Sequence, residues 1–297
     1  MDPRLRTNLF VVATGKLTTI GRQPDGDSIH FIPDNLKTLL ALPHASRLRP
    51  AASDNSVQLR IDGIDAPETH FEGQAQPQGV AAREVFLRAA GFSQVVFDAG
   101  GTVTASTPVT VPATIFIGLL DPYGRPVSYL LAGPTGEFKD GAVTALTEDI
   151  LARTVNTQML TSGAAYVTVY SSTPPAHRDF LFAQAHTAAS KKLGVWAADT
   201  SARFTLASHA SLGPDGHQLL LPKLFRRATS YLDAVAKGYN GPLPGWLAST
   251  ISDPLHSQDD YVIRAGGQAV RLHTLIHQQG DVITADLNLL QDVFIEQ

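Results

Sequence analysis

The amino-acid sequence predicts an α+β fold, in which a small closed β-barrel carries three packed helices and precedes a second, smaller α+β module. Short β-prone runs punctuated by glycine and proline fill much of residues 9–132, as is typical of barrel strands. Apolar residues spaced four apart form helical stripes that end just before a glycine. Residues 199–219 lose this periodicity and gain serine and glycine, which predicts a boundary between two modules.

The first strands are expected at residues 9–32 and 57–65. Two runs of alternating β-branched and polar residues flank the turn at 23–26, which predicts a hairpin. In the next run, Val57, Leu59 and Ile61 share one face and Arg60 and Asp62 the other, as a half-buried strand requires. Residues 33–56, rich in Pro, Asn, Asp and Ser, are expected to form an inserted loop with one helical turn.

Three helices are expected, beginning at Gly79 and spanning 148–161 and 178–193, with further β-prone runs between the first two. The order is about five short strands, with a helix between the third and the fourth and two helices at the end. This order suits a five-stranded barrel of the OB type, whose polar rim faces nucleic acids in many unrelated proteins. We therefore expect a barrel domain at 1–199, a linker at 200–219 and a C-terminal α+β module at 220–297.

The C-terminal module is expected to begin with an amphipathic helix at 220–238, followed by a hairpin that turns at 266–267. Lys223, Arg226 and Arg227 could contact nucleic acid, but a solvated helix face is the simpler expectation. His273 and His277 have the spacing of a zinc pair on a helix. Because no third ligand is evident, we expect an ordinary helix surface there.

Composition excludes several classes of protein. The 297 residues are 43% apolar and 17% charged, which is typical of a compact globular chain. A formal net charge of −4 argues against a protein that binds nucleic acid through a broad basic surface, so any phosphate site must be local. The absence of cysteine excludes disulfides, thiolate zinc sites and cysteine nucleophiles. No apolar run reaches the length of about 18 residues that a membrane span needs, and we expect a cytoplasmic protein.

Four short segments carry candidate chemistry: PDGDSIHF at 24–31, LRIDGIDAPET at 59–69, DPYGRPVSYLL at 121–131 and KKLGVW at 191–196. Their content and order resemble the staphylococcal nuclease family, over about residues 15–197. The joint occurrence of all four is far more specific than any one of them, since DGD alone is a common turn. The resemblance implies the five-stranded OB barrel with three helices.

The resemblance also implies a metal site. It identifies Asp27 and Asp65 as carboxylate ligands of Ca²⁺, together with the backbone carbonyl of Ala66. Calcium prefers six to eight oxygen ligands in a flexible shell, which water and a substrate phosphate would complete. An oxygen site of this kind could also hold Mg²⁺ or Mn²⁺.

The same resemblance implies the catalytic residues. Glu68 matches the carboxylate that positions or deprotonates the attacking water. Arg60 and Arg125 match two guanidinium groups that bind the phosphate, because their planar forks can donate paired hydrogen bonds to its oxygens. One cation, two arginines and one carboxylate are what phosphodiester hydrolysis requires.

The implied function is a Ca²⁺-dependent, sugar-non-specific nuclease that acts on DNA, RNA or both and leaves 5′-hydroxyl and 3′-phosphate ends. We expect it to act as an endonuclease. The alternative is a catalytically inactive OB-fold module that binds nucleic acid or a protein. The C-terminal module could then bind a protein partner or a second copy of the chain. DNA or RNA preference, endo or exo action, pathway and oligomeric state stay open.

The sequence also departs from the family pattern. The loop between Asp27 and Arg60 is longer than in the short members, and insertions are expected at about 98–118 and 133–150. The family has a Tyr-x-Tyr pair beside the base, whereas this chain has Tyr166 and Tyr170 at a different spacing. Base stacking on these rings therefore stays an open expectation.

Overall fold

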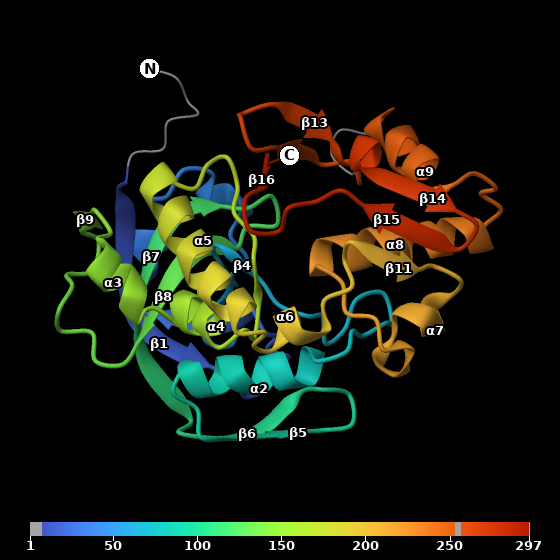
Figure 1. The fold of residues 1–297 in the computed structure, drawn as a ribbon. Coiled ribbons are helices and arrows are strands. Elements are labelled where there is room, and N and C mark those ends of the chain that lie inside the picture. The colour runs from blue at the N-terminus through green and yellow to red at the C-terminus, as the bar shows by residue number, and fades with distance from the viewer. Residues whose placement is uncertain (1–7, 253–256, 297) are drawn as a thin grey trace.

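The computed structural model describes residues 8–252 and 257–296. Figure 1 shows a barrel with helices packed on it, beside a C-terminal part that contains smaller sheets and helices. The predicted α+β class is confirmed by this arrangement.

Five strands form the barrel. They are β1 (Phe10–Thr18), β2 (Ser28–Pro33), β3 (Val57–Ile61), β7 (Thr110–Leu120) and β8 (Pro126–Ala132). Their order is β2-β3-β8-β7-β1, and β1 pairs again with β2, which closes the barrel. β3 and β8 run parallel, with Arg60 opposite Val127. A two-residue strand, β9 (Val143–Thr144), pairs with the beginning of β1. The predicted closed five-stranded barrel is therefore confirmed.

The barrel interior is filled by alternating apolar side chains. In β3, Val57, Leu59 and Ile61 are buried while the intervening residues are partly exposed, as the period of two in a strand dictates. β1 approaches β2 closely at Gly15, where a Cβ atom would lie 2.2 Å from the carbonyl oxygen of Ile32. Only glycine allows this approach.

The helices of the barrel domain are α2 (Gly79–Ala89), α3 (Glu148–Arg153), α4 (Val155–Thr161), α5 (Pro175–Ser190) and α6 (Val195–Ala198). The helix expected at 148–161 is divided at Thr154, whose side chain caps α4 by accepting a hydrogen bond from the backbone of Thr157. The buried Asn156 of α4 binds the barrel through the backbone of Asp62, Ser128 and Leu130. These hydrogen bonds anchor α4 to β8 and to the turn after β3.

The segments expected as insertions differ from one another. Residues 33–56 contain α1 (Leu36–Leu40) and a 3₁₀ turn (Ala45–Arg47), as predicted for a loop with a helical turn. The insertion expected at 98–118 is wrong in its bounds. β5 (Gln94–Phe97) and β6 (Val103–Thr107) form a hairpin below α2 (Figure 1), whereas residues 110–118 belong to β7, because their apolar side chains fill the barrel. Residues 133–150 hold β9 and the beginning of α3.

The C-terminal part has two three-stranded sheets and three α-helices within the described residues. One sheet has the order β11-β15-β14 and the other β13-β12-β16. The strands are β11 (Arg203–Thr205), β12 (Tyr261–Ile263), β13 (Ala269–Arg271), β14 (Ile276–Gln279), β15 (Val282–Ala285) and β16 (Val293–Phe294). The helices are α7 (His209–Leu212), α8 (Pro222–Ala236) and α9 (Leu243–Ser249), and 3₁₀ turns occupy Pro214–Gly216, Thr250–Ser252 and Leu272–Leu275.

Two local expectations for this part need correction. Residues 200–219 are not an extended connection, because they contain β11, which pairs with β15, and α7. His273 and His277 do not share a helix. His273 lies in a 3₁₀ turn, where its Nδ1 is 2.7 Å from Oδ2 of Asp259, and His277 lies in β14.

The two parts share buried surface. The C-terminal core includes Tyr166 and Val195 of the barrel domain. Phe294 of β16 exchanges backbone hydrogen bonds with the segment after β10 (Tyr166–Val167), donating to Val169 at 3.0 Å and accepting from Ser171 at 2.7 Å. These contacts hold the C-terminal part against the barrel.

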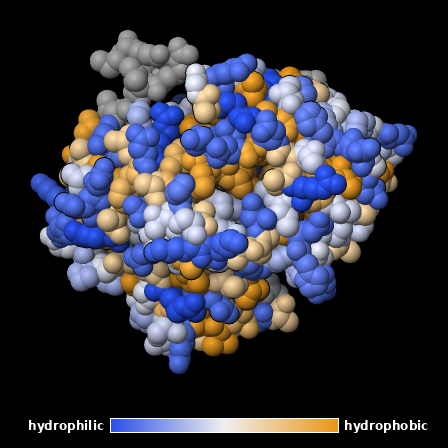
Figure 2. All heavy atoms as spheres, in the orientation of Figure 1, coloured by the Kyte–Doolittle hydropathy of each residue, from blue (hydrophilic) through white to orange (hydrophobic). Residues whose placement is uncertain are grey.

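Figure 2 shows hydrophilic residues spread over one face of the molecule rather than gathered in a single patch, in keeping with the small net charge. Within residues 8–252 and 257–296, none of the helices has both the length and the apolar content needed to cross a membrane.

Candidate active site

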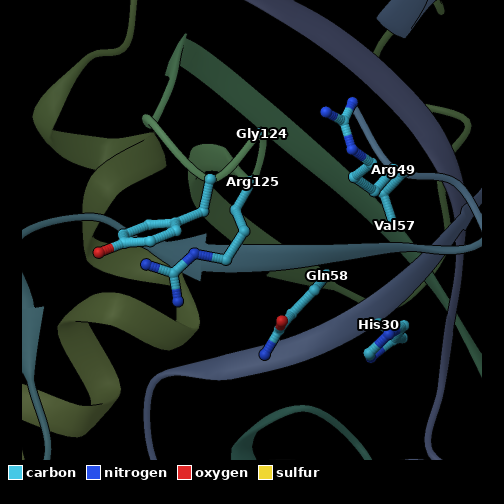
Figure 3. Close-up of a pocket in the computed structure, with 7 residues that line it drawn as sticks. His30, Arg49, Val57, Gln58, Gly124 and Arg125 are labelled. Carbon is cyan, nitrogen blue, oxygen red and sulfur yellow. The ribbon is translucent and has the colours of Figure 1, made fainter. Parts of the chain in front are cut away.

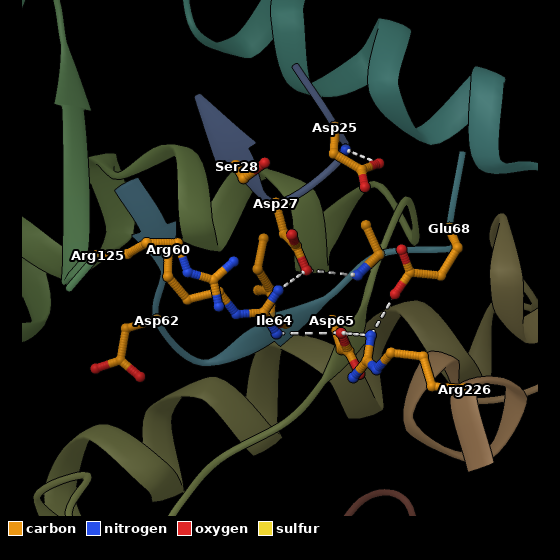
Figure 4. A network of polar contacts seen from close by, with 12 residues as sticks. Asp25, Asp27, Ser28, Arg60, Asp62, Ile64, Asp65, Glu68, Arg125 and Arg226 are labelled. Carbon is orange, nitrogen blue, oxygen red and sulfur yellow. Dashed lines mark hydrogen bonds and ion pairs between the residues drawn. The ribbon is translucent and has the colours of Figure 1, made fainter. Parts of the chain in front are cut away.

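Asp27, Arg60 and Asp65 converge at one rim of the barrel. Asp27 directly precedes β2, and its carbonyl accepts a hydrogen bond from the backbone of Ile61 in β3. Asp65 lies in the short strand β4 (Ile64–Asp65). The guanidinium of Arg60 bridges the two acids: Nη1 donates to Oδ2 of Asp27, and Nη2 donates to Oδ1 of Asp65 at 3.1 Å (Figure 4). One planar fork therefore brings both predicted metal ligands to the same point.

Glu68 lies in the irregular segment that follows β4. Its backbone N–H donates to Oε1 of the buried Gln76 at 3.1 Å. The first residue of α2, Gly79, packs against this segment: a Cβ atom at Gly79 would lie 2.4 Å from the carbonyl oxygen of Glu68. The absence of a side chain at Gly79 lets the helix close on the segment that carries the acid.

Arg226 of α8 enters the same site, which the sequence did not predict. Its Nη2 donates to Oδ2 of Asp65 at 2.9 Å, and its Nη1 donates to Oδ1 of Asp65 at 3.2 Å and to Oε1 of Glu68 (Figure 4). The expected solvated face of α8 is wrong, because the Arg226 side chain is only 18% exposed and Lys223 and Arg227 bind the buried Asp260. The spacing of Lys223, Arg226 and Arg227 at i, i+3 and i+4, which places three basic side chains on one side of the helix, is the sequence feature that could have indicated this contact.

Arg125 lies at the end of the tight turn that leads into β8. Its Nε donates to Oδ2 of Asp121 at 2.6 Å, and its backbone N–H donates to Oδ1 of the same acid at 2.8 Å. Because β8 pairs with β3 at Val127 and Arg60, Arg125 is brought to the neighbourhood of Arg60. Both arginines are drawn in Figure 4. The guanidinium of Arg125 pairs with Asp121, whereas that of Arg60 pairs with Asp27 and Asp65.

The acids of this site differ in basicity. Burial raises the pKa of Asp65, but Arg226 and Arg60 outweigh burial and lower it to about 2. Burial raises the pKa of Glu68 to about 7, although Arg226 opposes this rise, and the neighbouring Asp25, Asp27 and Asp65 reinforce it. Acids whose environments push their pKa values apart are typical of groups with separate roles in acid–base chemistry.

Asp25 lies next to this cluster and is held by its own turn. Its Oδ1 accepts hydrogen bonds from the backbone of Gly26 at 2.7 Å and from the hydroxyl of Thr69 at 3.2 Å. Burial, reinforced by the charge of Asp27, raises the pKa of Asp25 to about 6. Negative charge is therefore concentrated on this side of the site and favours a cation there.

A pocket of about 410 Å³ adjoins the site and shares Arg125 with it (Figure 3). It is lined by His30, Arg49, Val57, Gln58, Tyr123, Gly124 and Arg125. The lining has two arginines and no acid. Burial lowers the pKa of His30 to about 4, so its imidazole is neutral at pH 7. The pocket is therefore suited to an anionic group bound by the two arginines.

The pocket depends on a close contact between the inserted loop and the turn before β8. A Cβ atom at Gly124 would lie 1.9 Å from the carbonyl oxygen of Arg47, and Gly124 has φ +84°. Beside it, Tyr123 is 78% exposed, and the guanidinium carbon of Arg125 lies 5.5 Å from the centre of its ring. An exposed ring next to two arginines can stack on a base.

Tyr166 and Tyr170, for which base stacking is an open expectation, do not form an exposed pair. Tyr166 is fully buried, and its hydroxyl donates to Asp199 at 2.9 Å. Tyr170 packs on Phe294 and has the Lys223 ammonium 5.2 Å from its ring centre. Tyr123 is thus better placed than either of them to meet a ligand.

Asp27 and Asp65 supply oxygens of the kind that a hard cation prefers, and a single guanidinium contacts both acids. Ala66 is buried beside them, and its backbone N–H lies 3.4 Å from Oδ2 of Asp27. Within the described residues, no group of three or more His, Asp or Glu side chains is arranged to hold a metal. A calcium ion here would therefore take most of its ligands from backbone, water and substrate.

Comparison with known proteins identifies the barrel domain. Residues 58–198 match the family model described as staphylococcal nuclease homologue. No curated protein matches this chain. The matched segment contains Arg60, Asp65, Glu68 and Arg125, whereas Asp27 precedes it and Arg226 follows it.

Proposed function

We propose, from the match of residues 58–198 to the staphylococcal nuclease family, that this chain is a Ca²⁺-dependent nuclease that cleaves DNA, RNA or both within the strand. The observation that supports this proposal most directly is the Arg60 guanidinium, which joins Asp27 to Asp65, while Glu68 shares the guanidinium of Arg226 with Asp65. These residues come from separate segments of the chain and meet at one rim of the barrel.

In the proposed reaction, Arg60 and Arg125 bind the oxygens of the scissile phosphate and stabilise the negative charge that grows on them. Glu68 takes a proton from a water molecule as the water oxygen bonds to phosphorus. The bond from phosphorus to the 5′ oxygen breaks, and that oxygen takes a proton from solvent, which leaves 5′-hydroxyl and 3′-phosphate ends. Glu68 then returns its proton to solvent. A pKa of about 7 suits this exchange near neutral pH.

Asp27, Asp65 and the carbonyl of Ala66 would hold the calcium ion. When bound, the ion would supply charge neutralisation at the phosphate and would lower the pKa of a coordinated water.

Nucleic acid as the substrate is supported by the pocket at Arg49, Tyr123 and Arg125 (Figure 3). A strand whose scissile phosphate contacts Arg125 can place its next phosphate near Arg49 and a base on Tyr123. This arrangement concentrates positive charge at one place, as a chain with a formal net charge of −4 requires.

A supercoiled plasmid and a structureless RNA, each incubated with Ca²⁺ or with EDTA, test the proposal. We expect both substrates to be cleaved in the presence of Ca²⁺ and to stay intact in the presence of EDTA. Nicking of the closed circle shows internal cleavage, because a circle has no ends. Glu68→Gln and Arg125→Ala should each abolish most of the activity. Activity that survives in both variants would show that the site is assigned wrongly, and binding without cleavage by the wild type would favour the non-catalytic alternative.

A further inference from the structure

Arg226 lies in α8, outside the segment that matches the nuclease family, and yet its guanidinium is part of the candidate site. Every hydrogen bond that this guanidinium makes within the described residues goes to Asp65 or Glu68. Its side chain is 18% exposed, the same fraction as that of Arg60. The contact is therefore a buried one and not a surface ion pair.

The neighbouring basic residues of α8 show that this contact is selective. Lys223 and Arg227 bind the two oxygens of Asp260, at 3.2 and 2.8 Å, within the C-terminal part itself. A buried charge needs a partner, and the C-terminal part supplies one for both of these residues. Of the three, Arg226 is the one that hydrogen-bonds the acids of the candidate site.

α8 is held in place by the C-terminal core on one side and by a hydrogen bond to the barrel domain just before its first residue. Leu224, Phe225 and Ala228 are buried in the C-terminal core. Directly before the helix, the carbonyl of Leu220 accepts a hydrogen bond from the side chain of Gln76, the residue that also binds the backbone of Glu68. Through Gln76, the helix that carries Arg226 is therefore linked by hydrogen bonds to the segment that contains Glu68.

We propose that Arg226 is a positioning residue for the hydrolysis, so that the C-terminal part completes the nuclease site; this inference rests on the proposed function. The carboxylates of Asp65 and Glu68 lie close together and repel one another. A planar guanidinium that donates to both holds their separation and orientation, which leaves Asp65 directed at Arg60 and Glu68 free to meet a water. A lysine, as a single point of charge, would reproduce this only in part.

The opposite role for the same contact is inhibition, in which Arg226 blocks the acids until it is displaced. The two roles predict changes of opposite sign when the side chain is removed. Loss of a positioning residue lowers kcat, whereas loss of a blocking residue raises activity.

The test compares Arg226→Ala and Arg226→Lys with wild type, and uses Arg227→Ala as the matched control. Arg227 is the next residue of α8, is similarly buried and pairs with an acid away from the site. Steady-state cleavage of a polynucleotide is measured with Ca²⁺, and the melting temperature of each protein is recorded. We expect Arg226→Ala to lose about 10- to 100-fold in kcat with KM changed little, which is the usual effect of removing an outer partner of a site.

Chemical rescue separates positioning from a general loss of structure. Millimolar guanidinium should restore part of the activity of Arg226→Ala, and urea, a neutral molecule of the same shape, should not. Arg226→Lys should lie between wild type and Arg226→Ala, and Arg227→Ala should keep a kcat near that of wild type. If Arg226→Ala does not fold, kcat is measured on Arg226→Lys and Arg226→Gln instead. A lower kcat in these variants supports positioning, and a higher one supports blocking.

An unchanged or increased kcat in folded Arg226→Ala, or an equal loss in Arg227→Ala, would overturn the inference while leaving the proposed function intact. A wild-type protein that cleaves no polynucleotide under any metal condition would overturn the proposed function and this inference with it.

Discussion

The side chain of Gln76 donates a hydrogen bond to the backbone carbonyl of Leu220 at 2.8 Å and so joins the barrel domain to the residues that lead into α8. The side-chain oxygen of Gln76 accepts a hydrogen bond from the backbone N–H of Glu68. Gln76 is 3% exposed. One buried side chain thus relates the position of the candidate base to that of the helix that carries Arg226.

Replacement of Gln76 by leucine should therefore lower both stability and activity. It leaves a buried carbonyl and a buried N–H without these partners, at a cost of about 1–3 kcal/mol for each. Urea denaturation and kcat measure the two effects. Gln94→Leu, at an exposed position in β5, is the control. If Gln76→Leu has wild-type stability, the amide does not join the two parts in solution.

Calcium should stabilise the folded protein through Asp27. A ligand present at 100 times its Kd adds about 2.7 kcal/mol to the free energy of unfolding. The melting temperature of wild type should therefore rise with Ca²⁺ and return with EDTA. Asp27→Asn keeps the shape of the side chain and removes its charge, so the rise should largely vanish, whereas the exposed Asp179→Asn should keep it. An equal rise in both variants would place the ion elsewhere.

Arg49 should contribute a phosphate contact that depends on salt. In a Glu68→Gln background with Ca²⁺, binding of a single-stranded oligonucleotide is measured at increasing salt concentration. Loss of one phosphate contact should reduce the slope of log K against log salt by roughly 0.7 to 1. Arg47→Ala removes an exposed arginine two residues away that does not line the pocket. If the Arg49 and Arg47 variants give equal slopes of log K against log salt, the pocket does not contribute a phosphate contact to oligonucleotide binding.

Alanine at position 124 should disturb the same pocket. Gly124 has φ +84°, and a Cβ atom there would lie 1.9 Å from the carbonyl oxygen of Arg47. The left-handed conformation alone costs an alanine about 1–2 kcal/mol, and the clash adds to it. We expect lower stability and weaker oligonucleotide binding, because the turn carries Arg125. Gly136→Ala, with nothing within 4 Å of the added Cβ, should resemble wild type; similar behaviour of the two variants would contradict the close contact.

The pH dependence of stability should include a contribution from His30. Burial, with help from Arg22, lowers the pKa of His30 from 6.5 to about 4, while Asp54 opposes this shift. Between these values the unfolded chain binds a proton that the folded protein does not, so stability falls as the pH decreases from 6.5 toward 4. His30→Gln should make this fall smaller, as measured by urea midpoints at pH 7 and pH 5. An unchanged fall would show that His30 is not buried as described.

Much of the fold follows from local sequence patterns. The alternation of Val57, Leu59 and Ile61 predicted a half-buried strand, and this strand is part of the closed barrel. The apolar run of β7 was harder to interpret, because a strand buried along most of its length does not alternate in the same way. Residues 110–118 therefore resemble an insertion in the sequence, although they form a barrel strand in the structure.

By itself, the sequence determined the barrel, its helices and the acids and arginines of the candidate site, because strands, turns and short motifs are encoded by neighbouring residues. Only the tertiary structure decided that Arg226 joins Asp65 and Glu68. More than 150 residues separate Arg226 from these acids, and the local pattern around it describes an ordinary amphipathic helix. Which partner a basic residue finds depends on how two cores pack together, and that packing is a property of the whole chain.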